Sequence, residues 1–210
     1  MNHIFQPHDS LWNNHAKLAG LRSVLDPNNQ DNRKNTYINY LHRHIISSIR
    51  PSVVDKCVLD FGCGSGRFSK ILSADAGKVI AVDITLEMLS RAAKEIKAEN
   101  VSYITIDGIN LPLKNGAVDN ILSVWVLQYA ARNQDIYRSI MREFKRVLKP
   151  GGSIFILEQV SFAPEEHMRP ECTLRIKDYL GEMEKYFYIK NAYPVRGAGR
   201  RSFLQRLAVK

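Results

Sequence analysis

Three aspartates, each at the end of a short apolar run, are the residues of this chain best placed to do chemistry. Asp60, Asp83 and Asp107 each follow such a run. The runs predict buried strands, and strands that alternate with helices pair in parallel, with their carboxyl ends at one edge of the sheet. Because ligands of open α/β sheets bind at that edge, we expect Asp83, at the end of the second run, to accept hydrogen bonds from hydroxyl groups of a ligand.

The segment directly after the first aspartate has glycine at every second position, 62, 64 and 66, and apolar spacing typical of a helix resumes at Phe68. A strand–turn–helix whose turn has almost no side chains lets backbone N–H groups approach a ligand closely. The dinucleotide pattern G-x-G-x-x-G would require glycine at position 67, where this chain has Arg67. An NAD-dependent oxidoreductase is therefore disfavoured.

From residue 57 onward, strand-like runs alternate with helical stretches or longer connections. A helix over about 86–98 and another over about 134–148 separate some of the runs, and Asn133 is a suitable N-cap for the second helix. This alternation predicts parallel strands joined by right-handed crossovers in a single α/β domain. The predicted strands are 57–61, 78–82, 101–106, 119–126 and 153–158.

Residues 1–50 are polar and rich in asparagine, with helical patches. Apolar residues that recur every three to four positions predict one buried face of a helix ending at Pro51. We expect 1–50 to form a helical cap and 51–210 to form a single compact unit. The face comprises Tyr37, Leu41, Ile45 and Ile49.

The last fifty residues differ in character from the alternating part. A helix near 171–184 precedes two β-rich runs, 185–189 and 202–209, which flank a Gly/Pro loop and predict a hairpin. The formal net charge is +9, and the stretch 190–210 holds six basic residues and no acid. Such an excess of positive charge is typical of a solvated surface, or of a protein that binds an acidic substrate or nucleic acid, and the sequence leaves all three possibilities open.

Five ordered motifs resemble those of class I S-adenosylmethionine (SAM) methyltransferases, in particular the small-molecule enzymes of methyltransferase type 11. The resemblance covers about 55–160 well and the C-terminal part loosely. The stretch 111–123 is similar to the passage of that family into its fourth strand. The other matches are the Asp-x-Gly-x-Gly-x-Gly loop 60–66, the acid Asp83, the pair Asp107-Gly108 and the turn 148–152.

The resemblance implies a Rossmann-like, doubly wound, seven-stranded sheet, mostly parallel with a C-terminal antiparallel hairpin. It also implies SAM as cofactor and S-adenosylhomocysteine as product. The glycines would pass beneath the methionine part, Asp83 would hold the ribose, Asp107 with Gly108 would meet the adenine, and Ile84 would pack on it. Asp60 would order the loop. The full implied set is Asp60, Phe61, Gly62, Cys63, Gly64, Gly66, Asp83, Ile84, Met88, Asp107, Gly108 and Ser123.

The methyl acceptor is expected at the loops after the fourth and fifth strands. The first carries Trp125, Gln128 and Tyr129, and it lacks the Asn/Asp-Pro-Pro-aromatic motif with which related enzymes methylate amino groups of bases. The second contains His167. A catalytic role for Gln128, Tyr129 or His167 competes with a purely solvated or packed one. Also in the second loop are Glu158, Gln159 and Arg169.

Two further segments are candidates for the acceptor side. We hypothesise that arginines of the terminal hairpin recognise a carboxylate or phosphate, because arginine forms bidentate pairs with both. The alternative is a basic hairpin without such a role. The N-terminal helices would cover the cofactor as a lid, with Trp12 and Tyr37 lining it, or would simply pack on the sheet edge. The hairpin arginines are Arg196, Arg200 and Arg201.

The leading hypothesis is a methyltransferase that moves the methyl group of SAM to an oxygen or nitrogen of a small, acidic molecule by in-line displacement. The alternatives are an RNA methyltransferase, motivated by the basic C-terminus, and a non-catalytic subunit with the same fold. Three cysteines without pair or metal spacing favour a reducing compartment. Since neither a signal peptide nor an apolar stretch of ~20 residues is apparent, we expect a cytoplasmic protein. The spacing of the cysteines also predicts that no metal is bound.

Overall fold

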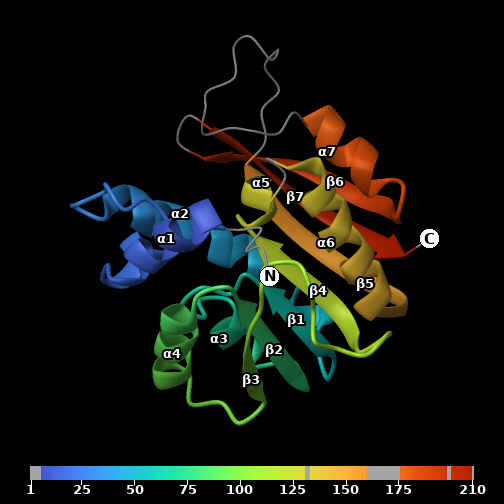
Figure 1. Ribbon diagram of the computed structural model, residues 1–210, viewed down its shortest axis with the longest axis horizontal. Coiled ribbons are helices and arrows are strands. Elements are labelled where there is room, and N and C mark those ends of the chain that lie inside the picture. Colours follow the sequence, from blue (N-terminus) through green and yellow to red (C-terminus); the bar gives the residue numbers. More distant parts are fainter. Residues whose placement is uncertain (1–5, 131–132, 160–175, 198–199, 210) are drawn as a thin grey trace.

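The computed structural model describes residues 6–130, 133–159, 176–197 and 200–209. Its centre is a seven-stranded sheet with strand order β3-β2-β1-β4-β5-β7-β6 (Figure 1). The first five strands pair in parallel, and β7 is antiparallel to both β5 and β6. The predicted α/β, Rossmann-like fold with a mostly parallel sheet is confirmed. The strands are β1 Cys57–Phe61, β2 Lys78–Asp83, β3 Val101–Thr105, β4 Val118–Val124, β5 Leu148–Gln159, β6 Phe187–Gly197 and β7 Arg200–Val209.

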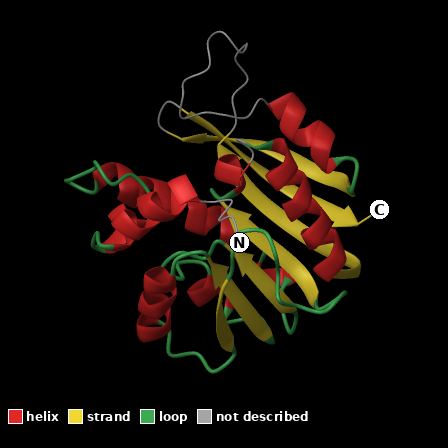
Figure 2. Ribbon diagram, viewed as in Figure 1, coloured by secondary structure: helices red, strands yellow, loops and turns green. Residues whose placement is uncertain are grey.

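Helices cover both faces of the sheet (Figure 2). Successive strand residues point to opposite faces, so strands buried on both sides must be apolar throughout. Leu59 and Ile121 face the core that α5, α6 and α7 complete, whereas Val58 and Leu122 face the core formed with α2 and α3. The helices are α1 Gln6–Ala16, α2 Arg33–Ser47, α3 Ser69–Leu72, α4 Leu86–Glu95, α5 Leu127–Ala130, α6 Gln134–Val147 and α7 Ile176–Met183, with 3₁₀ turns at Gly20–Ser23 and Arg50–Ser52.

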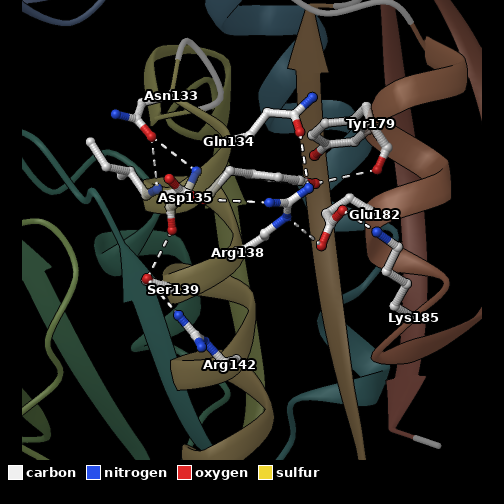
Figure 3. A network of polar contacts seen from close by, with 11 residues as sticks. Asn133, Gln134, Asp135, Arg138, Ser139, Arg142, Tyr179, Glu182 and Lys185 are labelled. Carbon is white, nitrogen blue, oxygen red and sulfur yellow. Dashed lines mark hydrogen bonds and ion pairs between the residues drawn. The ribbon is translucent and has the colours of Figure 1, made fainter.

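The start of helix α6 is marked in the sequence by an N-cap residue, Asn133. The side chain of Asn133 accepts hydrogen bonds from the backbone N–H groups of Asp135 and Ile136 at 2.9 and 3.2 Å, which confirms the predicted N-cap. Polar contacts then connect α6 to α7 (Figure 3): Arg138 lies 3.4 Å from the Glu182 carboxylate, and the Tyr137 hydroxyl donates to the Tyr179 carbonyl. These contacts hold α7 against α6.

The buried face of α2 differs from the predicted one. Tyr37 is 51% exposed, and Leu41 and Ile45 are only partly buried. The buried face of α2 contains two polar residues. A prediction that considers apolar residues alone therefore places that face one residue away from its true position. One of them, Asn35, exchanges hydrogen bonds with the backbone of Asp26. The buried residues are Asn35, Ile38, His42 and Ile46.

The end of α1 is attached to the rest of the domain through Arg91 of α4. Its guanidinium donates to the carbonyl of Leu18 at 2.8 Å and also to the carbonyl of Ala16, the last residue of α1. Carbonyls at a helix C-terminus have no partner within the helix, so a cation there satisfies them. The arginine therefore fastens the N-terminal helices to α4.

We expect Arg91→Met to lower the free energy of unfolding by about 1–2 kcal/mol, because two carbonyls lose a charged donor. Lys94→Met is the matched control, since Lys94 is exposed on the same helix. Urea denaturation followed by circular dichroism measures both. An equal loss in the two variants would contradict an anchoring role of Arg91.

Among the helices in the described part of the chain, none combines the length and the hydropathy that a bilayer span requires.

Candidate functional site

One cavity lies at the carboxyl ends of β1, β2 and β4, the edge where the sequence predicted a site. Its empty space amounts to about 970 Å³ when the part that opens to solvent is included. Its walls combine two carboxylates, one cation and several aromatic rings. The lining residues on which the argument depends are Trp12, Asp60, Gly62, Cys63, Gly64, Arg67, Asp83, Ile84, Met88, Gly108, Trp125 and Tyr129.

Glycines form part of the cavity wall because the backbone there is left-handed and closely packed. Gly62 and Gly64 have φ of +72° and +54°. A Cβ at Gly62 would lie 2.4 Å from a Val126 methyl, and one at Gly64 would lie 2.9 Å from Val24. Gly66, with φ +80°, does not line the cavity; its missing side chain leaves room for Ala92 and Ile96. Gly66 therefore serves helix packing, and its predicted place beneath a ligand stays a prediction.

Asp60 is buried at the end of β1, with a side chain only 2% exposed. The Ser69 hydroxyl donates to its carboxylate at 2.6 Å, which joins β1 to the start of α3 across the glycine loop. Burial raises the pKa of Asp60 to about 6, although the Ser69 hydrogen bond and the charge of Arg67 both favour the ionised form. This geometry suits the predicted role of ordering the loop.

Asp83 joins β2 to the glycine loop while still lining the cavity. Its carboxylate accepts from the N–H of Gly64 at 2.8 Å and from the N–H of Thr85 at 2.9 Å. Burial raises its pKa, and these two hydrogen bonds oppose the shift. Through these two hydrogen bonds the same carboxylate also orders the turn that leads into α4. Two oxygens with further lone pairs remain able to accept from a ligand.

The remaining predicted cofactor residues divide into two groups. Phe61, Cys63, Ile84, Met88 and Gly108 line the cavity. Asp107 and Ser123 do not.

The carboxylate of Asp107 accepts from the N–H groups of Ile109 and Asn110 in its own turn. Ser123 is buried within β4, and its hydroxyl has no partner among the described residues. The turn at 107–110 therefore presents backbone to the cavity, through Gly108, rather than the predicted acid.

Trp125 follows β4 with a left-handed backbone, φ +58°, which is unusual for an aromatic residue and typical of functional sites. Its N–H donates to the Leu157 carbonyl at 2.8 Å, and its indole nitrogen is buried without a partner in the described part of the chain. The ring meets His42 of α2 edge-on at 4.7 Å. Tyr129 packs edge-on against Trp12 at 5.0 Å. Two N-terminal helices therefore contribute to an aromatic wall, although Tyr37 does not.

Glu158 is the residue that holds this wall in place, a role that no local sequence pattern predicts. It is fully buried at the end of β5, and its carboxylate accepts from the N–H groups of Val126, Leu127 and Gln128 at 2.8, 2.8 and 3.3 Å. The segment after Trp125 is thereby capped at the start of α5. Gln128 is itself part of that segment; it is buried and does not line the cavity. Its catalytic role stays a prediction.

Glu158 also gives the fold a pH dependence. Burial raises its pKa to about 8, against the three N–H donors that favour the anion. A carboxyl whose pKa is higher in the folded state stabilises the fold below its unfolded pKa and loses that contribution as the pH rises to about 8. We therefore expect the advantage of wild type over Glu158→Gln to shrink by about 2 kcal/mol between pH 6 and pH 8.

Urea denaturation of both proteins at the two pH values measures this change, and groups common to both proteins cancel in the difference. A constant difference would mean that Glu158 is already ionised at pH 6, with the N–H donors outweighing burial.

The other acceptor-side candidates are placed only in part. His167 and Arg169 lie outside the described residues. The backbone pairs Arg196 with Arg201 and Gly197 with Arg200, and Ser202 lies opposite Gln159 at the carboxyl end of β5. The paired ends of β6 and β7 therefore lie at the edge of the sheet that carries the cavity, while the side chains of the arginines are outside the described part.

Comparisons with known proteins agree with this site. A family model described as a methyltransferase domain matches residues 59–156. Phosphoethanolamine N-methyltransferase 1 of Triticum aestivum is 32% identical over 155 residues, which are 71% of this chain and 29% of that protein. Demethylmenaquinone methyltransferase of Lactococcus lactis subsp. lactis is 34% identical over 107 residues, 48% of this chain and 41% of that protein.

A solved structure extends the likeness to the N-terminal helices. Phosphoethanolamine N-methyltransferase 1 of Haemonchus contortus, in complex with phosphoethanolamine and S-adenosylhomocysteine, matches with a TM-score of 0.76 at 17% identity, over 98% of this chain and 49% of that one. At this identity the likeness concerns the fold. The chain spans less than half the length of each of these three relatives, two of which are named for phosphoethanolamine and one for demethylmenaquinone.

Proposed function

This chain belongs to the class I methyltransferases that depend on SAM, and on that premise we propose that it moves the methyl group of SAM to a small molecule. The observation that carries the proposal is the position of Asp83, a carboxylate at the end of β2 that the Gly64 N–H orients in the cavity wall. In open α/β sheets, an acid at this position accepts hydrogen bonds from ribose hydroxyls.

The cavity residues suit SAM as a ligand. The absence of side chains at Gly62 and Gly64 leaves backbone for the methionine part to approach. Ile84 and Met88 offer an apolar surface to the adenine ring, next to the backbone of Gly108. The cavity lining thus offers backbone groups to the charged methionine part and an apolar surface to the adenine ring.

When bound, SAM supplies an electrophilic methyl group on a positively charged sulfur. The task of the protein is to hold the acceptor in line behind that methyl group, and such positioning can supply ~7–11 kcal/mol of the barrier. We assign this task to the aromatic wall of Trp12, Trp125 and Tyr129, which Glu158 holds through the backbone of the α5 segment. The wall can also exclude water from the reacting atoms.

We further propose an oxygen or nitrogen nucleophile on a small acceptor with a carboxylate or phosphate, recognised by Arg196, Arg200 and Arg201. The two curated relatives reported above are named for different acceptors, which argues that this part of the site varies within the family. The proposed role of the arginines is supported by the position of the paired ends of β6 and β7 at the cavity edge of the sheet.

Calorimetric titration with S-adenosylhomocysteine tests the proposal, followed by transfer of labelled methyl groups to a panel of small amines, acids and phosphate esters. Binding in the micromolar range and transfer to one acceptor class are expected. Absence of binding would favour the non-catalytic subunit. Transfer to RNA, with RNA affinity that falls steeply with salt, would favour the RNA methyltransferase.

A further inference from the structure

Arg67 follows the glycine loop and lines the cavity together with Asp60 and Asp83. Among the described residues that line it, no other is a lysine, arginine or histidine. In the sequence this residue only argued against a dinucleotide site. Its position in the wall gives it a part in binding.

The guanidinium of Arg67 is held in place but is not neutralised by contact. One of its nitrogens donates to the Asn39 side chain of α2 at 3.0 Å, and its carbon lies 4.6 Å from the centre of the Phe68 ring. Asp60 is near enough to favour its charged form, yet no ion pair joins the two, and the Asp60 carboxylate accepts instead from Ser69. Burial lowers the pKa of Arg67 to about 10, so the group is still protonated at neutral pH.

A partly buried cation without a direct counter-ion loses hydration that one amide hydrogen bond and one ring contact replace only in part, so an anionic ligand gains from pairing with it. Arginine has several N–H donors arranged to bind a carboxylate in a bidentate manner, and among the described residues only Asn39 accepts from them. The structure therefore leaves one unmatched positive charge at the end of the glycine loop.

We infer that Arg67 binds the carboxylate of the methionine part of SAM, and that Asn39 of α2 orients the guanidinium for this contact. The inference rests on the proposed function, in which the methionine part lies along the same loop. An anion on the methyl acceptor is the competing source of the negative charge, and the experiment separates the two.

Isothermal titration of wild type and Arg67→Met with two ligands tests the assignment. S-adenosylhomocysteine carries the carboxylate, and its decarboxylated analogue, S-adenosyl-3-thiopropylamine, lacks only that group. Wild type is expected to prefer S-adenosylhomocysteine roughly 10- to 100-fold, the usual range for a hydrogen-bonded charge. Arg67→Met should bind the two ligands alike, and should bind the analogue about as well as wild type does.

Two further variants make the result specific. Arg43→Met removes the same charge from an exposed position on α2 whose field reaches Arg67, and it should keep the wild-type preference. Asn39→Asp leaves Arg67 intact but places a fixed carboxylate on it, so it should abolish most of the preference. This variant also keeps the idea testable if Arg67→Met does not fold.

A preference that survives in Arg67→Met would overturn the assignment, as would an equal loss of both ligands. Unchanged binding of both ligands with a raised KM for the acceptor would assign Arg67 to the acceptor's anion instead. If wild type binds neither ligand, the proposed function itself fails, which is a different result from failure of the Arg67 assignment alone.

Discussion

Replacing Asp83 with asparagine is expected to raise the dissociation constant of S-adenosylhomocysteine about 100-fold. A carboxylate that accepts from ribose hydroxyls makes charge-assisted hydrogen bonds of about 1.5–3 kcal/mol each, so loss of the charge should cost about 3 kcal/mol of binding. The amide keeps one oxygen for the N–H of Gly64 or Thr85, so the loop loses one of two contacts. Calorimetric titration at fixed salt measures the change.

Asp119→Asn is the matched control for Asp83→Asn. Asp119 is on the same sheet, where it accepts from the Cys57 N–H and from Lys149, each at 2.9 Å, and it does not line the cavity. The same charge is removed, so a general electrostatic effect would appear in both variants. If Asp83→Asn binds S-adenosylhomocysteine as tightly as wild type does, Asp83 serves only the turn at Thr85, and the ribose assignment is wrong.

The sheet could be predicted from sequence because its strands are buried on both faces. In β2, Lys78–Asp83, the four residues between the charged ends are all apolar and buried, and the strand boundaries follow from where that apolar run stops. Helix α2 could not be predicted as well. It buries His42 and Asn35, whose polar atoms pack or bond through contacts that no local pattern contains.

The site divides in the same way. The glycine loop and Asp83 belong to one strand–helix–strand unit, β1–α3–β2, so spacing along the chain was enough to find them. Glu158 acts on a backbone segment about 30 residues earlier, and Arg67 is oriented by Asn39, 28 residues away. Such pairs exist only once the fold has brought them together, and a left-handed Trp125 has no signature in its neighbours.

Gly62→Ala is expected to destabilise the domain by about 2–5 kcal/mol and to weaken binding of S-adenosylhomocysteine. An alanine at φ +72° costs about 1–2 kcal/mol of backbone strain. Its Cβ would also lie 2.4 Å from one Val126 methyl and 2.9 Å from the other, and overpacking of this kind costs about 1–3 kcal/mol. Since Val126 adjoins Trp125 in the aromatic wall, relief of the clash would displace the acceptor side of the cavity.

Two companions separate strain from contact. Gly151→Ala has nearly the same φ, +78°, with nothing within 4 Å of the new Cβ, so it should cost only the strain of about 1–2 kcal/mol. Gly62→Ala combined with Val126→Ala should be at least 1 kcal/mol more stable than the sum of the single changes implies. Urea denaturation of the four variants measures both terms. Strict additivity would mean that the glycine loop and the segment after β4 are not in contact, and the cavity described between them would then have to be abandoned.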